Sequence, residues 1–458
     1  MKIKHLTFIF LLGLFAYANT LSNGFVADDH QLLLQNTFYR SFDNIPRLFS
    51  TESSIKDTGY YTPFLTDKGS INPSFRLIDK ISFFFDYASF KLKPWGYHLT
   101  NLGIHLLNAL VLYLTLCELI PVHLAFYSSV IFCVHPIFAE AVSNISYRGD
   151  LLATLFVLLS FYAWINFARD LKLRGYYYGS LLFCLLAFLT KESTAPLPLM
   201  ILMYQGFFRK GRFALGFQSV FWLLLGWYLY VYFCVYPPTL WIQAKHESSL
   251  AALGVVVGVM GEYLKSFFVP GTIDPLPPRH MPHVEHVWAS VLVIASAAGA
   301  VLYVGRKNKE ILFFAGWFLI FYLPVANIIP LINPMAYRFV YLPAIGLCVA
   351  AVLIVHQIFQ AHFKGVRKSQ VPLIISLILT GFLIFQTVGL NSWYRSSRTL
   401  SYSWVKYFPQ NPWGYFFLGR EYFMAGEYPK AKATFEEGFK NGLKDPLALQ
   451  YWAKCIKK

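Results

Sequence analysis

The chain has 458 residues, of which 56% are hydrophobic, 19% aromatic and only 14% charged. Soluble domains carry about 25% charged residues, so the composition excludes an ordinary soluble protein and predicts an all-α polytopic membrane protein. The formal net charge of +16 indicates no nucleic-acid partner. The basic residues form short clusters between apolar runs, as the positive-inside rule predicts for cytoplasmic loops.

The apolar runs in chain order predict a bundle of about 11 transmembrane helices, with the N-terminus cytoplasmic and the C-terminus outside. The run 251–269 contains Glu262 and Lys265. If it crossed the membrane, the basic cluster 306–309 would lie on the wrong side, so we expect it to be re-entrant or to lie along the outer surface. The expected spans are residues 5–21, 98–118, 122–140, 150–168, 176–190, 193–208, 213–234, 287–305, 311–325, 340–360 and 371–390.

The first apolar run has an alternative interpretation. Lys2 and Lys4 precede it, and the small residues Ala16 and Ala18 resemble a cleavage site, so a cleaved signal peptide would also fit. As a span, the run instead anchors the first outer loop, residues 22–97, to the membrane. The topology then places most of the polar motifs at the outer surface.

An acid pair, Asp28 and Asp29, follows the first span. One interpretation is structural, with Asp28 capping a short helix or pairing with a basic loop residue. The other is catalytic, with one carboxylate as a general base and its neighbour tuning it, since close carboxylates raise each other's pKa. Position alone favours Asp29 as the base. Paired acids could also hold a divalent cation.

Further ionisable residues lie at the expected outer ends of spans, where a charge is a functional hypothesis by default. Glu140, Arg148 and Asp150 suit either a site or a structural ion-pair network. His98 and His105 share one helical face with Asn101 between them, a pattern that favours hydrogen bonding between helices over catalysis.

Two basic residues are candidates for binding a phosphate. Lys191 ends one expected span, and Arg338 precedes another. An interfacial arginine can be a simple membrane anchor, but its planar fork also suits a phosphate. The six cysteines are scattered without a metal-ligand spacing, so we expect them to be packing residues and predict no metal site from them.

Residues 392–458 differ in composition from the apolar domain 1–391 and predict a separate helical tail. Leu418 and Gly419, Tyr422, Ala431 and Phe435 fall at the spacings of a tetratricopeptide repeat. Tyr415 takes the usual Trp position, Gly438 follows as the small residue, and Pro446 is displaced. One repeat cannot bury its own face, so we expect this tail to dock on the membrane domain, a protein partner or another copy.

Taken in order, these motifs resemble the transmembrane and tetratricopeptide-repeat O-mannosyltransferase family of the GT-C glycosyltransferase superfamily. The resemblance extends over nearly the whole chain. It rests on residues 25–29, 97–109, 135–142, 148–150, 189–192 and 338–343, with Trp393, Leu400, Trp404 and Pro409.

The resemblance implies transfer of a sugar from a polyprenyl-phosphate carrier to an acceptor hydroxyl outside the membrane, with inversion. Asp28 or Asp29 would be the catalytic base, and Lys191 and Arg338 would bind phosphate, with Arg148 as a weaker candidate. Three further residues would shape the site: His98, Glu140 and Asp150.

The chain departs from the family pattern at three points. Ser74-Phe75-Arg76-Leu77 replaces a Tyr-Arg-Pro sequence, Tyr337 takes a position that is often Glu, and the repeat array is short. A lipid-linked or cell-envelope glycan is therefore an alternative acceptor to a protein. The short tail and simple basic N-terminus favour a bacterial inner membrane over the endoplasmic reticulum. The alternative from another class is a non-catalytic scaffold or lipid flippase whose tail recruits partners.

Overall fold

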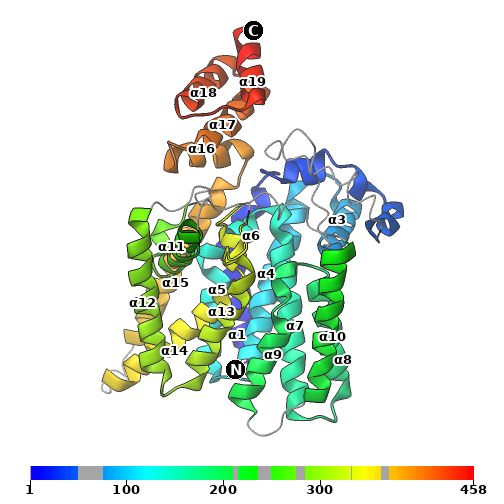
Figure 1. Ribbon diagram of the computed structural model, residues 1–458, viewed down its shortest axis with the longest axis vertical. Helices are drawn as coiled ribbons and strands as arrows, with labels where there is room; N and C mark the ends of the chain where they lie inside the picture. Colours follow the sequence, from blue (N-terminus) through cyan, green and yellow to red (C-terminus); the bar gives the residue numbers. More distant parts are fainter. Residues whose placement is uncertain are drawn as a thin grey trace.

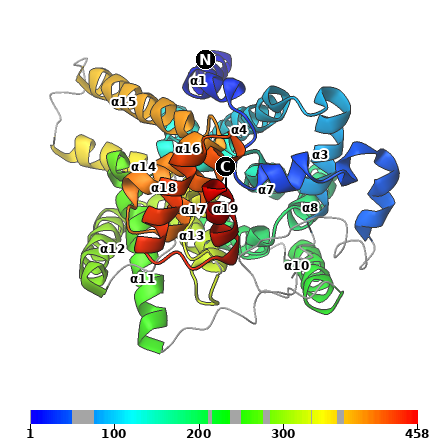
Figure 2. The same ribbon diagram turned by 90° about the horizontal axis from the view of Figure 1, so that it is seen from above.

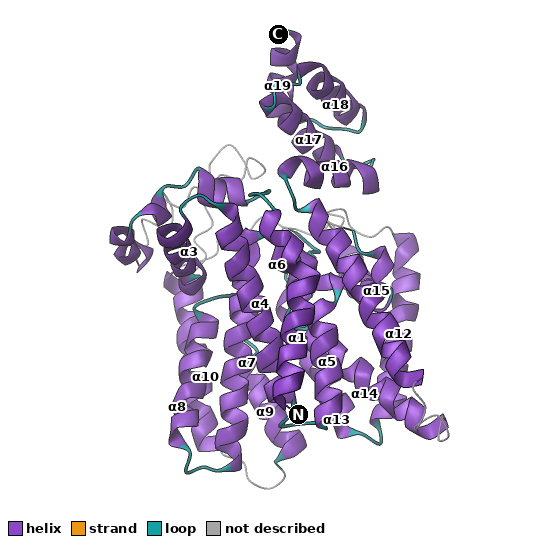
Figure 3. Ribbon diagram, turned by 180° about the vertical axis from the view of Figure 1, so that it is seen from behind, coloured by secondary structure: helices purple, strands orange, loops and turns teal. Residues whose placement is uncertain are grey.

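The computed structural model describes residues 2–49, 76–209, 215–235, 249–274, 284–331, 333–362 and 371–457. These residues form helices joined by short loops, with no strand among them (Figure 3). The all-α prediction is confirmed. The helices of the apolar domain are α1 (Lys2–Tyr17), α3 (Leu77–Phe90), α4 (Pro94–Leu116), α5 (Val122–Val134), α6 (Ala139–Ser143), α7 (Arg148–Arg169), α8 (Arg174–Phe188), α9 (Leu197–Phe208), α10 (Leu215–Tyr230), α11 (Ser249–Phe268), α12 (Val284–Gly305), α13 (Lys309–Tyr322), α14 (Ala344–His362) and α15 (Val371–Trp393).

Within the described residues, seven helices are long and apolar enough to cross a membrane, or eight if the pair Val122–Val134 and Pro136–Ser143, bent by 49°, is one span. The expected number of about 11 is therefore not reached by this criterion. The helices α8, α9 and α13 have 15, 12 and 14 residues. At about 1.5 Å per residue they are shorter than the ~30 Å hydrocarbon layer, although they run alongside the longer helices (Figure 1).

Helix α11 covers the ambiguous run and lies across the direction of the bundle. It is seen nearly end-on in Figure 1 and at its length from above in Figure 2. Lys265 pairs with Glu262 at 2.8 Å on its exposed side, whereas Tyr263 is fully buried. This orientation agrees with the expected placement along a surface.

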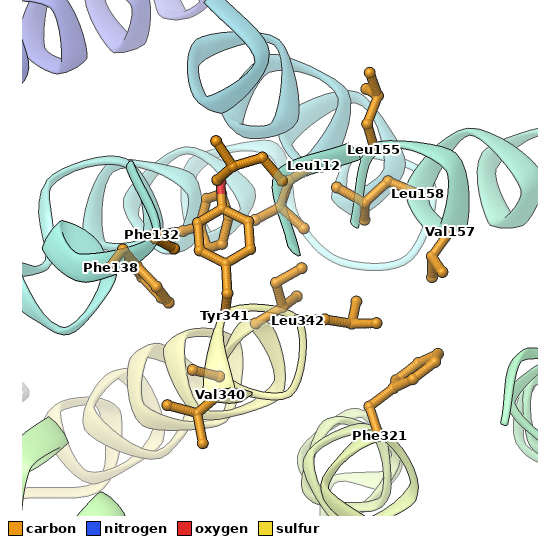
Figure 4. Close-up of a cluster of buried hydrophobic side chains, with 14 of the residues drawn as sticks. Leu112, Phe132, Phe138, Leu155, Val157, Leu158, Phe321, Val340, Tyr341 and Leu342 are labelled. Atoms are coloured by element: carbon orange, nitrogen blue, oxygen red, sulfur yellow. The ribbon is translucent and has the colours of Figure 1, made fainter. Parts of the chain in front are cut away.

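The bundle is organised around α7, which packs against α4 and α8. Its apolar stretch is 72% buried, against 6% for α12 at the periphery, as expected for a central helix that is hydrophobic all round. Behind the loop that follows α13, a core cluster surrounds Tyr341 (Figure 4). The Tyr341 hydroxyl lies 2.6 Å from Nδ1 of His105 and accepts from Asn108 at 3.2 Å.

The two ends of the bundle differ. The N-terminus of α1 lies at one end, whereas the C-terminal tail and the first long loop lie at the other (Figure 1). That loop contains short helical turns, η1 (Ala18–Ser22), η2 (His30–Leu34), η3 (Phe38–Arg40) and η4 (Phe42–Phe49), followed by α3. The predicted polar motifs therefore share the end of the bundle that carries the tail.

The tail consists of four helices: α16 (Ser397–Tyr407), α17 (Pro412–Met424), α18 (Tyr428–Lys440) and α19 (Pro446–Ile456). A capping box between Ser396 and Thr399 fixes the start of α16. In the α17–α18 hairpin a Cβ on Gly419 would lie 2.7 Å from the ring of Phe435, so a small residue is required there. The helix pair matches the predicted pattern; its assignment as a tetratricopeptide unit, and the domain boundary, remain predictions.

Some sequence-based predictions lie outside the described residues. They are Ser74 and Phe75 of the sequence that departs from the family pattern, and residues 50–75 of the predicted first outer loop 22–97.

Candidate functional site

The acid pair occupies a short segment between η1 and η2. Ala27, directly before it, has φ of +47°, a left-handed conformation that costs free energy for a residue with a Cβ. Asp28 lies in the same turn as Ala27, and Asp29 has helical φ and ψ directly before η2. The two carboxylates have different surroundings: Asp29 is buried and Asp28 is half-exposed.

Asp29 is fully buried and its two oxygens are hydrogen-bonded. Oδ2 accepts from the Val26 N–H at 3.0 Å. Oδ1 accepts from the Ser146 N–H at 2.8 Å and from the Ser146 hydroxyl. Burial raises the pKa of Asp29 to about 7, although these hydrogen bonds act to lower it. The residue thus ties the acid segment to the turn before α7.

Asp28 is the accessible member of the pair. Its carboxylate accepts no hydrogen bond from any residue that the structure describes. It lies within charge-interaction range of Arg338. A base needs first to be within reach of its substrate, and a matched pKa comes second. The near-neutral pKa of Asp29 suits a base, but its burial prevents contact with an acceptor, so the geometry favours Asp28, contrary to the preference from position.

Arg338 lies in the turn η12 (Tyr337–Val340) and is held by Glu140 from α6. Its Nη1 donates to Glu140 Oε1 at 2.5 Å and its backbone N–H to Oε2 at 3.0 Å. The guanidinium carbon lies 3.9 Å from the ring centroid of Tyr147. Burial acts to lower the pKa of Arg338, but neighbouring acidic groups raise it overall. The guanidinium therefore stays charged.

The turn that carries Arg338 is braced by α11. The Tyr263 hydroxyl donates to the Ala336 carbonyl at 2.9 Å and accepts from the Ala336 N–H at 3.0 Å. Phe267 stacks on His135 with centroids 4.7 Å apart. Helix α11, which lies across the bundle, thus supports both sides of the Glu140–Arg338 pair.

Lys191 reaches the same place from the turn after α8. Its Nζ donates to Asp150 Oδ1 at 2.6 Å, and both side chains are less than 10% exposed. Burial lowers the pKa of Lys191, and Asp150 opposes that effect. Phe339 lies between the two cations, 5.7 Å from the Lys191 ammonium and 4.9 Å from the Arg338 guanidinium carbon. The two predicted phosphate ligands therefore converge on one ring.

Arg148 has a different environment from these two cations. It is fully buried at the start of α7 and forms an ion pair with Asp86. It also donates to the Asn101 side chain at 2.8 Å, the Ser82 hydroxyl at 3.1 Å and the Tyr97 carbonyl at 3.2 Å. These contacts hold α3, α4 and α7 together, which indicates a structural role and not phosphate binding.

The histidines of α4 connect helices. His98 Nε2 donates to the carbonyl of Gly24, four residues before Asp28, at 3.3 Å. His105 lies between Tyr341 and the Cys133 carbonyl, the latter 3.0 Å away. Asn101 donates to the Asn144 carbonyl at 3.1 Å. These contacts agree with the predicted hydrogen bonding between helices. His98 also contacts the segment that leads to the acid pair, and its role in shaping the site stays a prediction.

Sequence reasoning assigned no site role to two groups beside Lys191. Arg76 forms a two-point ion pair with Glu192, at 2.5 and 3.1 Å. Burial would raise the pKa of Glu192, but Arg76 lowers it to about 2.

The second group is Asp79 of α3. It lies over Gly149, where an added Cβ would be 3.4 Å from the Asp79 carboxylate. Burial raises the pKa of Asp79 to about 6. The sequence feature that could have pointed to these acids is their spacing, because Asp79 and Asp86 lie seven residues apart on one helical face.

The buried acid Asp29 predicts a pH dependence of stability. Between pH 4 and 7 the folded chain binds more protons at this carboxyl than the unfolded chain, so the unfolding free energy should fall as pH rises and level off above about pH 7. Asp29→Asn should lack this component. Thermal unfolding of both proteins in detergent from pH 5 to 8 tests it. Parallel melting-temperature curves would contradict the prediction.

Within the described residues no group of three or more His, Cys, Asp and Glu side chains is arranged to hold a metal ion. Among the described residues the site instead consists of cations paired with carboxylates, together with the half-exposed carboxylate of Asp28, which accepts no hydrogen bond from them, and the buried carboxylate of Asp79, whose Oδ1 also has no partner among them. Such a set suits an anionic ligand at the two cations and a proton acceptor at Asp28.

The fold and the site define a polytopic helical membrane protein with a charged site at one end of its bundle. The chain is similar to animal proteins named protein O-mannosyl-transferases. It is 34% identical to TMTC2 of Mus musculus over 166 residues, 36% of this chain and 18% of that protein. It is 30% identical to Tmtc1 of Drosophila melanogaster over 190 residues, 40% of this chain and 20% of that protein. It is 28% identical to F38B6.6 of Caenorhabditis elegans over 160 residues, 34% of this chain and 22% of that protein.

The resemblance noted from the motifs is thereby confirmed, at about 30% identity over about a third of the chain. The matched region covers only about a fifth of the length of these relatives. No family model matches the chain.

Proposed function

We propose that this protein is a membrane glycosyltransferase that moves a sugar from a polyprenyl-phosphate carrier to an acceptor hydroxyl. The observation that carries the proposal is the placement of Asp28, a carboxylate with no hydrogen-bond donor among the described residues, within charge-interaction range of Arg338, which shares the ring of Phe339 with Lys191. The names of the relatives support mannose as the sugar and a protein hydroxyl as the acceptor.

The geometry suits a direct displacement. The acceptor oxygen attacks the anomeric carbon while Asp28 takes its proton. The bond from that carbon to the carrier phosphate breaks, and its electron pair stays on the phosphate oxygen. Arg338 and Lys191, held in place beforehand by Glu140 and Asp150, stabilise the charge that develops there. Attack opposite the leaving group inverts the anomeric configuration.

The topology supports placing the site, the acid segment and the tail on the outer or lumenal side of a membrane. All three lie at the end of the bundle opposite the N-terminus (Figure 1). A lipid-linked donor would then present its phosphate at the depth of Arg338 and its sugar toward Asp28. The animal relatives favour the endoplasmic reticulum over a bacterial inner membrane as the setting.

The test is incubation of the purified protein with a panel of radiolabelled polyprenyl-phosphate sugars and acceptor peptides containing Ser and Thr, with and without a chelator. We expect transfer from one donor, with inverted configuration. Loss of transfer with chelator, restored by a divalent cation, would add a metal to the mechanism. Absence of transfer from every donor, with binding or translocation of the lipid intact, would favour the scaffold or flippase.

A further inference from the structure

The segment that carries the acid pair is attached to the tail at three points. The Gly24 N–H donates to the Arg395 carbonyl at 3.0 Å. Val26 packs in a small buried cluster with Tyr394 and Leu400, separate from the main core. These contacts place the start of the tail directly against the residues before Asp28.

The third attachment lies on the other side of the acid pair. His30 Nε2 hydrogen-bonds to the Ser397 hydroxyl at 3.0 Å. Asp28 and Asp29 therefore lie between two anchors on the same stretch of tail, 394–400. The strained residue Ala27 also packs against the Val26 cluster. Such a conformation persists only where its surroundings hold it.

The stretch 394–400 is in turn fixed to the rest of the tail. The capping box of Ser396 and Thr399 sets the first turn of α16, and further along that helix Trp404 stacks on Phe417 of α17, with centroids 5.4 Å apart. A Cβ on Gly414 would lie 3.2 Å from the Val405 backbone nitrogen, so α16 and α17 are in close contact. Through these contacts the α17–α18 hairpin fixes the position of α16, and the stretch 394–400 in turn fixes the position of the acid segment.

We infer that α16 positions the catalytic base, with Leu400 as the principal positioning residue. The tail then does more than offer a surface for partners, because it holds the segment that carries Asp28 on both sides of that residue. This role rests on the proposed function, since it assigns the tail a part in that reaction. Leu400 touches neither substrate in this scheme and acts only through Val26 and the segment that follows.

The test uses the full-length protein and a matched pair of variants. Leu400 and Leu443 are 4% and 5% exposed, but Leu443 packs in the core of the hairpin and not against the acid segment. Leu400→Ala should raise hydrogen exchange at the amides of residues 24–30, the Gly24 amide above all. It should lower kcat by about tenfold or more with the donor KM unchanged. Leu400→Met should keep both the exchange at 24–30 and kcat near their wild-type values. Leu443→Ala should leave exchange at 24–30 as in the wild type.

Unchanged exchange at 24–30 in Leu400→Ala would overturn the inference, as would an equal change in Leu443→Ala. Raised exchange with an unaltered kcat would show contact without a positioning role and would also overturn it. If the wild type transfers no sugar, the proposed function fails and the positioning role fails with it, whereas exchange still reports whether the tail holds the segment.

Discussion

Asp28→Asn is expected to abolish sugar transfer, with a loss of roughly 10²–10⁴-fold in rate, the usual contribution of a general base. The amide keeps the shape of the side chain but cannot take the acceptor proton. Because the Asp28 carboxylate accepts no hydrogen bond from the described residues, expression, thermal stability and donor binding should remain as in the wild type. Single-turnover transfer and donor titration measure the two effects separately.

The matched control is Asp29→Asn at the neighbouring position. Here the amide nitrogen must face either the Val26 N–H or the Ser146 donors, so one hydrogen bond becomes a contact between two donors. We expect lower thermal stability and a partial loss of rate. Wild-type activity in both Asn variants would refute catalysis by the acid pair. Full loss at Asp29 with an active Asp28→Asn would transfer the role of base to Asp29.

Arg338→Ala is expected mainly to weaken donor binding. A charge-assisted hydrogen bond contributes about 1.5–3 kcal/mol, which corresponds to roughly 10- to 100-fold in affinity. Arg338→Lys should recover only part of this, because an ammonium lacks the planar fork. Binding of a polyprenyl-phosphate sugar in detergent micelles measures it. Unchanged donor affinity in Arg338→Ala would refute the assignment.

A second variant separates binding from folding. Removing Arg338 leaves the buried Glu140 carboxylate without its counter-charge, a change that typically costs about 3–5 kcal/mol of stability. The double variant Arg338→Ala with Glu140→Gln should recover melting temperature but not donor affinity. If affinity returned together with stability, Arg338 would be a structural residue only.

Much of the fold could be predicted because apolar runs and basic clusters are local signals. They predicted the helices, and they are consistent with the orientation of α11 across the bundle and with the gathering of polar motifs at one end. The predicted number of spans, about 11, exceeds the seven or eight described helices that are long and apolar enough to cross a membrane. The difference arises because α8, α9 and α13 are too short to meet this length criterion. Sequence shows where an apolar run lies but not where a turn interrupts its helix.

The site itself was only partly predictable. Lys191, Arg338 and the acid pair were found because they stand at the ends of spans, but their partners come from distant segments. Arg148 was the weaker candidate for phosphate binding, and the sequence around it does not show that α3 and α4 bury it and supply its partners. Asp28 and Asp29 could not be told apart either. The difference depends on the left-handed backbone at Ala27 and on a serine 117 positions away.

The ion pairs of the site also have a consequence for biosynthesis. Arg338 and Glu140 are 198 positions apart, and Arg76 and Glu192 are 116 apart. Neither pair can form until the much later segment has been made and inserted. Long-range contacts of this kind form slowly. The Glu140–Arg338 pair can close only when α13 has already been made, so this part of the site forms late in the assembly of the bundle.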